Sequence, residues 1–185
     1  MSADTTGADA GPTTGADAGP TTGADAGPTT GADAQPAPEG ALPEGFREIA
    51  EDFHALGPKD RLQLLLEFSN GLPALPERYT DHPELLEPVP ECQSPIFLIT
   101  EVEGEGRDAA AHLFFSAPPE APTTRGFAGI LAEALDGRTV GEVLDTPDAV
   151  TAELGLAEVV SPLRLRGMSG MLGRIKRQLR EKAGL

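Results

Sequence analysis

The most reactive side chain available to this sequence is its single cysteine, Cys92. It lies in the stretch PVPECQSPIF, residues 88–97, after two prolines and directly before an apolar run typical of a β-strand. Pro95 has no backbone N–H and cannot donate to a sheet, so we expect strand pairing to begin only at Ile96. The sequence therefore predicts a thiol on a loop that is held against the start of a strand.

A lone thiol on such a loop is open to two interpretations. Reactive cysteines are partly exposed beside donors or positive charge, and Gln93 and Ser94 could supply donors here. Free cysteines are more often buried as small apolar residues, and the adjacent carboxylate of Glu91 should raise the thiol pKa. One cysteine excludes an internal disulfide, a CxxC redox pair and a cysteine-built zinc site. With no export signal, we expect the thiol to stay reduced in the cytoplasm.

Three histidines, His54, His82 and His112, are the candidates for a base that could activate the thiol. A cysteine hydrolase needs such a base within hydrogen-bonding reach, together with a group that orients it. Only His82, in the proline-rich connection before the cysteine, could fold back on Cys92, and no local signature supports that pairing. Scattered histidines also make a poor metal site, so we expect neither a metal nor another cofactor.

Helices on both sides of a pair of strands are predicted by the apolar spacing and by the positions of glycine and proline. The EGEG stretch lacks the lysine of a phosphate-binding loop and is interpreted as a hairpin turn. The expected elements are helices over 46–56, 61–68, 123–137, 140–145, 147–154 and 162–179, strands over 96–102 and 109–116, and an irregular connection over 72–91. This order predicts an α+β domain in which a small antiparallel sheet is packed on one face by several helices.

Two regions follow from composition, a tail over residues 1–45 and a domain over residues 46–185. The tail contains four copies of an eight-residue unit, TTGADAGP with one variant, and the unit has no large apolar residue. It cannot offset the entropy of ordering its backbone, so we expect a disordered acidic segment. The net charge of −16 argues against binding nucleic acid, and no stretch is apolar enough to cross a membrane.

Several motifs resemble those of the SufE family, the sulfur acceptors that work with cysteine desulfurases. VPECQSPIFL resembles the family's VPGCQSxVWL, and GLPALPERY is similar to its G-x-x-LPxLP approach. LGLAEVVSPLRLRGMSGML resembles LGLxxHLSPSRxNGLxxM near the family's C-terminus. The resemblance runs from about Phe46 to Lys182 and implies the α+β fold shared by SufE and IscU. Glu91 stands here where the family has glycine, Phe97 where it has tryptophan and Arg166 where it has asparagine.

The resemblance also implies a role for each site residue. Cys92 would receive sulfane sulfur as a persulfide, and Gln93 and Ser94 would shape its loop. Arg164, at the arginine of the SPSR motif, would stabilise the thiolate or persulfide anion. Glu120, near the family's SDA motif, would hold the loop or the partner. A carrier of this kind needs one reachable thiol and no second thiol beside it, since a neighbouring thiol would discharge the sulfur as a disulfide.

The expected function is therefore to take persulfide sulfur from a pyridoxal-phosphate-dependent cysteine desulfurase onto Cys92 and to pass it on for iron–sulfur cluster assembly. An iron–sulfur scaffold complex is the candidate acceptor, and the chain would act as the partner of an enzyme. Two alternatives stay open. One is a SufE-like binding module that regulates a desulfurase without carrying sulfur, and the other is a thiol peroxidase or hydrolase. At rest we expect the thiol to be tucked toward an apolar cavity, with the loop swinging out on docking.

Overall fold

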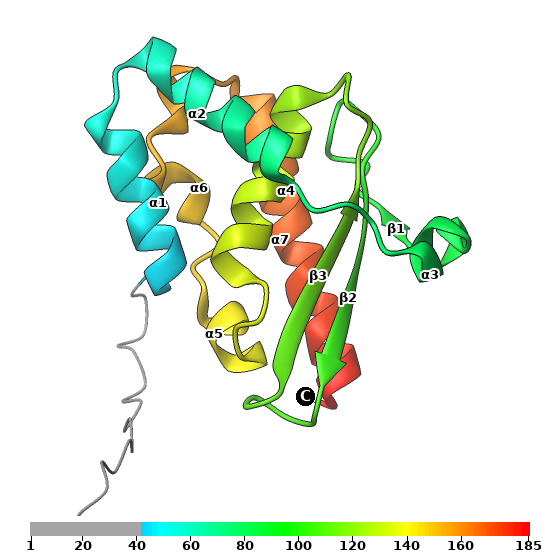
Figure 1. The fold of residues 1–185 in the computed structure, drawn as a ribbon. Helices are drawn as coiled ribbons and strands as arrows, with labels where there is room; N and C mark the ends of the chain where they lie inside the picture. The colour runs from blue at the N-terminus through cyan, green and yellow to red at the C-terminus, as the bar shows by residue number, and fades with distance from the viewer. Residues whose placement is uncertain (1–41) are drawn as a thin grey trace, which may run out of the picture. The chain divides into compact units, whose positions relative to one another are not determined.

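The computed structural model describes residues 42–185, which form the coloured ribbon in Figure 1. The repeat-containing tail expected over residues 1–45 lies almost entirely outside the described residues. Within them no helix is long and apolar enough to span a membrane. The elements are α1 (Glu44–Ala55), α2 (Pro58–Gly71), α3 (Glu77–Thr80), β1 (Glu87–Pro88), β2 (Phe97–Glu103), β3 (Ala110–Ser116), α4 (Pro122–Leu135), α5 (Val140–Asp145), α6 (Val150–Glu153) and α7 (Pro162–Ala183), with 3-10 turns at Pro83–Leu85 and Leu156–Glu158.

A three-stranded antiparallel sheet in the order β1-β2-β3 forms one layer of the fold. β2 and β3 pair along their whole length, and β1 pairs with the start of β2, where Pro88 lies opposite Phe97. The EGEG stretch is the predicted hairpin turn between β2 and β3. Its glycines, Gly104 and Gly106, have φ values of 108° and 70°, in the left-handed region that favours glycine.

Helices α4 and α7 pack on one face of this sheet, and α1 and α2 pack on α4 beyond it (Figure 1). Side chains alternate along the strands, so that Leu98 and Thr100 of β2 and Leu113 and Phe115 of β3 are all buried. The predicted class, an α+β fold with a small antiparallel sheet covered by helices, is therefore confirmed.

Helix α7 supports the cysteine loop, and its apolar stripe was predicted from the sequence. The stripe is buried at Met168, Leu172, Ile175 and Leu179. Pro162 occupies the first turn, where its missing N–H removes no helical hydrogen bond. Ser161 is at the N-cap position, although its hydroxyl makes no capping hydrogen bond.

The connection over residues 72–91 is more regular than predicted, since it contains α3, a 3-10 turn and β1. Tyr79, Leu86 and Val89 are buried in it and hold these short pieces on the domain. Elements of two to four residues are too short to show a periodic pattern in the sequence. The first helix also begins two residues before the expected domain boundary, and Leu42 packs against the core.

Candidate functional site

Cys92 lies in the connection between β1 and β2, residues 89–96, here called the cysteine loop. At its base the Val89 N–H donates to the Ile96 carbonyl over 3.0 Å, so pairing begins at the residue after Pro95, as predicted. Within the loop the Cys92 N–H donates to the Val89 carbonyl over 3.1 Å, which forms a tight turn directly before the thiol. The local geometry expected for the cysteine is therefore confirmed.

The thiol is half-buried against the backbone of α7. Cys92 packs against the hydrophobic core yet stays partly exposed. The cavity beside it is lined mostly by polar side chains, so the expectation of an apolar cavity was wrong. A Cβ atom at Gly167 would lie 2.8 Å from the Cys92 Sγ, well inside the roughly 3.5–4.0 Å of an ordinary contact. At Gly170, one turn further, a Cβ would lie 3.1 Å from the side chain of Glu91. The two glycines thus form the face of α7 that supports the cysteine loop.

A small cavity of about 160 Å³ lies beside the thiol, between the cysteine loop, the start of α4 and the start of α7. One water molecule takes up roughly 30 Å³ in the liquid, so a sulfur atom attached to the thiol has room there. The structure brings all five site residues predicted from the sequence to this cavity: Cys92, Gln93, Ser94, Glu120 and Arg164.

The first turn of α4 and Arg164 form the part of the cavity wall that favours negative charge. Thr123 and Thr124 line the cavity at the start of α4, and Arg164 Nη1 donates to the Thr123 hydroxyl over 3.3 Å. First-turn N–H groups have no partners within their helix and attract anions, and the guanidinium adds a full positive charge. This wall can stabilise a thiolate or a persulfide, whereas Glu120 is exposed beside it.

In the resting arrangement the thiol is protonated at neutral pH. Burial raises the pKa of Cys92 to about 11, the Glu91 carboxylate adds to the rise, and the Arg174 guanidinium opposes it. Glu91 therefore raises the pKa of the Cys92 thiol, as predicted from the sequence. Because an unperturbed cysteine titrates at about 8.5, very little thiolate is present in this state. A nucleophilic role requires the surroundings of Cys92 to change.

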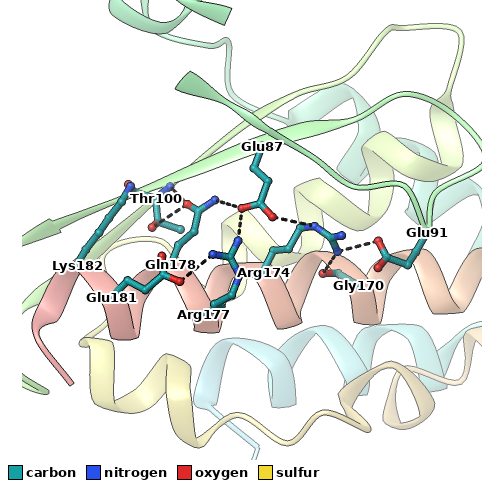
Figure 2. Close-up of polar contacts among 9 residues, drawn as sticks. All are labelled: Glu87, Glu91, Thr100, Gly170, Arg174, Arg177, Gln178, Glu181 and Lys182. Atoms are coloured by element: carbon teal, nitrogen blue, oxygen red, sulfur yellow. Dashed lines mark hydrogen bonds and ion pairs between the residues drawn. The ribbon is translucent and has the colours of Figure 1, made fainter. Parts of the chain in front are cut away.

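An ion-pair network joins the cysteine loop to α7, as Figure 2 shows. Arg174 Nη1 lies 2.7 Å from a Glu91 carboxylate oxygen, and Arg174 Nε lies 3.3 Å from Glu87 in β1. The same guanidinium donates to the carbonyl of Gly170 over 3.2 Å. Glu87 is paired with Arg177 as well. The glutamate next to the cysteine is therefore an anchor of the loop.

The three histidines lie in the described part of the chain, and none of them lines the cavity. His82, which sequence spacing allowed near the thiol, pairs instead with Glu84 at 2.9 Å. His54 is hydrogen-bonded to a backbone carbonyl of α6, and His112 lies on β3 near two carboxylates. Residues 42–185 thus place no histidine base beside Cys92, nor do they contain a cluster of side chains that could hold a metal ion.

The fold and the site together define a class: α+β proteins that present a single thiol between two strands, beside an arginine-lined cavity. The family model of SufE, described as an Fe-S metabolism associated domain, matches residues 47–179. An uncharacterized SufE-like protein of Mycobacterium tuberculosis H37Rv is 52% identical over 141 residues, which cover 76% of this chain and 95% of that protein. The chain therefore belongs to the SufE family.

Two further matches are more distant in sequence. SufE-like protein 1, chloroplastic/mitochondrial, of Arabidopsis thaliana is 28% identical over 133 residues, which cover 71% of this chain and 33% of that protein. The solution structure of a hypothetical protein from Thermus thermophilus matches with a TM-score of 0.65 and 34% identity, over 78% of this chain and 100% of that one. The family, the fold and the association with iron–sulfur metabolism that the motifs implied are confirmed.

Sequence reasoning missed the residues of α7 and β1 that support the cysteine loop. Neither Arg174 nor Glu87 was singled out as a site residue. Gly167 and Gly170 carried a usable signal, because two glycines one turn apart on a helix allow close backbone approach. No sequence pattern pairs Arg174 with Glu91, since they lie on separate elements.

Proposed function

We propose that this chain accepts persulfide sulfur from a pyridoxal-phosphate-dependent cysteine desulfurase onto Cys92 and passes it on for iron–sulfur cluster assembly. The observation that carries the proposal is the cavity beside the only cysteine of the sequence, with Arg164 and the start of α4 in its wall. Membership of a family associated with iron–sulfur metabolism supports the same role. A reducing cytoplasm is the compartment that suits it, because the thiol must stay free.

The transfer is a substitution at sulfur that needs no external oxidant. The Cys92 thiolate attacks the outer sulfur of the persulfide on the desulfurase. A sulfur–sulfur bond forms at Cys92 while the bond to the desulfurase cysteine breaks, and that cysteine leaves as a thiolate. In the second step a thiolate of the downstream acceptor, such as an iron–sulfur scaffold complex, attacks the outer sulfur, and Cys92 leaves as a thiolate.

Each site residue has a part in this chemistry. Arg164 and the first turn of α4 hold the negative charge of the thiolate or persulfide. Gln93 and Ser94 shape the loop around the sulfur, and Glu120 holds the loop or contacts the partner. The closed loop keeps Cys92 protonated and shielded from oxidation, and the thiolate forms when the sulfur moves off the hydrophobic core while still within reach of Arg164.

The half-buried, protonated thiol also favours a second candidate function, a binding module that regulates a desulfurase without carrying sulfur. Burial and the neighbouring carboxylate raise the pKa of Cys92 to about 11, which disfavours nucleophilic attack in this state. Replacing Cys92 by serine separates the two functions, because a pure regulator would keep its effect on desulfurase turnover.

The test is intact-protein mass spectrometry of the full chain after incubation with a purified cysteine desulfurase and cysteine. A carrier gains one sulfur atom, reversibly on addition of thiol, and Cys92→Ser gains none. Arg164→Ala should slow the loading about tenfold, because a charge-assisted contact to the anion is lost. Arg166→Ala, further along the same helix and outside the cavity, is the matched control. No sulfur gain, with turnover altered equally by wild type and Cys92→Ser, would establish the regulator instead.

A further inference from the structure

We propose that Arg174 is a positioning residue for Cys92: through its ion pair with Glu91 it holds the cysteine loop closed on α7, and breaking this pair releases the thiol toward a partner. That the partner is a desulfurase rests on the proposed function. The control of the loop by Arg174 does not, and it can be measured on the isolated chain.

The arginine half of this pair is also held by contacts outside the cysteine loop. Arg174 lies on α7 with its side chain only 18% exposed, and it donates to the Gly170 carbonyl. Its Nε lies 3.3 Å from Glu87, an ion pair without hydrogen-bond geometry. Glu87 is held in turn by Gln178, whose amide donates to it over 2.9 Å and whose carbonyl accepts the Thr100 N–H over 2.9 Å. Figure 2 shows this chain of contacts running from the loop to the sheet.

The glutamate half of the pair lies on the cysteine loop, next to the thiol. The side chain of Glu91 is 44% exposed, and its 2.7 Å contact with Arg174 is the ion pair that ties the cysteine loop to α7 among the described residues. Gly170 makes the contact possible, because a side chain at that position would meet Glu91 at 3.1 Å. Since Glu91 directly precedes Cys92, holding this carboxylate on α7 restrains the backbone next to the thiol.

When the loop opens, the buried Arg174 still has a partner. Arg174 keeps its ion pair with Glu87 when Glu91 departs, so the large penalty of an isolated buried charge does not apply. A partly exposed ion pair of this kind shifts an equilibrium by about two- to fivefold. The pair is therefore strong enough to bias the loop toward the closed state and weak enough for a docking partner to overcome.

The experiment measures the rate at which iodoacetamide alkylates Cys92 in the full chain. Charge alone would also change this rate, because the Arg174 cation favours the thiolate and the Glu91 carboxylate disfavours it. A double-mutant cycle of Glu91→Gln and Arg174→Gln removes that contribution, since the two separate charge effects cancel from the coupling term. We expect Arg174→Gln to accelerate alkylation about two- to fivefold more in the wild-type background than in the Glu91→Gln background.

Two further variants distinguish positioning from general loosening of the helix. Arg174→Lys keeps the positive charge and the pairing, so its rate should return toward the wild-type rate. Arg177→Gln removes another cation paired with Glu87 but does not touch Glu91, so its rate should stay unchanged. The proposal is overturned if Arg174→Gln changes the rate by the same factor in both backgrounds, or if Arg177→Gln accelerates alkylation equally. Because no desulfurase takes part, failure of sulfur transfer leaves this result intact.

Discussion

Replacing Gly167 by alanine tests whether the thiol lies directly on α7. The added Cβ would stand 2.8 Å from the Cys92 Sγ. Contacts of this kind are normally about 3.5–4.0 Å, so the sulfur must move outward by roughly 0.7–1.2 Å. Alanine in a helix interior is worth about 0.5–1 kcal/mol over glycine, while overpacking costs about 1–3 kcal/mol. We therefore expect Gly167→Ala to leave the free energy of unfolding unchanged or to lower it by up to about 2.5 kcal/mol.

Gly173→Ala is the matched control, because it lies on the same helix with nothing within 4 Å of an added Cβ. It should realise the full gain of about 0.5–1 kcal/mol. Urea unfolding gives the stability of both variants, and iodoacetamide alkylation reports the exposure of Cys92. Only Gly167→Ala should speed the alkylation, by several-fold, since it displaces the thiol from its half-buried position.

Replacing Cys92 by alanine provides the internal check. Without the sulfur atom the nearest atoms to an added Cβ are the Cα and Cβ of residue 92, at 3.4 and 3.7 Å, which are ordinary contacts. Gly167→Ala should therefore cost less in the Cys92→Ala background than in wild type. Equal stabilities and equal alkylation rates for Gly167→Ala and Gly173→Ala would refute the placement of the thiol on this glycine face.

Three further outcomes are expected. Because its pKa is raised to about 11, Cys92 should be alkylated at pH 8 about a hundredfold more slowly in the folded chain than in the urea-unfolded chain. The alkylation rate of the folded chain should still increase at pH 10, and a plateau near pH 9 would contradict the raised pKa. Lys176 donates to the buried carbonyl of Thr146 and pairs with the exposed carboxylate of Asp148. Lys176→Met should lower the free energy of unfolding by about 1–3 kcal/mol in urea titrations, because it leaves the Thr146 carbonyl without its donor. Asp148→Asn, at the exposed partner, should cost less than about 1 kcal/mol. Gly129→Ala should lower the thermal midpoint strongly, since its Cβ would lie 2.3 Å from a backbone oxygen of α2, and Gly71→Ala, with open space around it, should change the midpoint little.

The cysteine loop and the core stripe of α7 could be predicted because their causes are local. Pro95 removes a donor beside Cys92, so the start of strand pairing follows from one residue's chemistry. The spacing of Met168, Leu172 and Ile175 follows from the helical repeat, whatever packs against them. The motif around Cys92, together with that around Arg164, was also enough to place the chain in its family.

Tertiary structure alone decided how the thiol behaves. The pair of Arg174 with Glu91 joins a helix and a loop that are distant along the chain, and the cavity beside Cys92 needs a third segment at the start of α4. The rise in pKa that the adjacent Glu91 causes could be predicted from the sequence, but burial, which is the larger cause, and the opposing charge of Arg174 depend on tertiary packing. The sequence by itself determined that one cysteine would stand on a loop beside a strand. Packing on α7 decided that this cysteine rests protonated and half-buried, since desolvation and ion pairing act through distances in space.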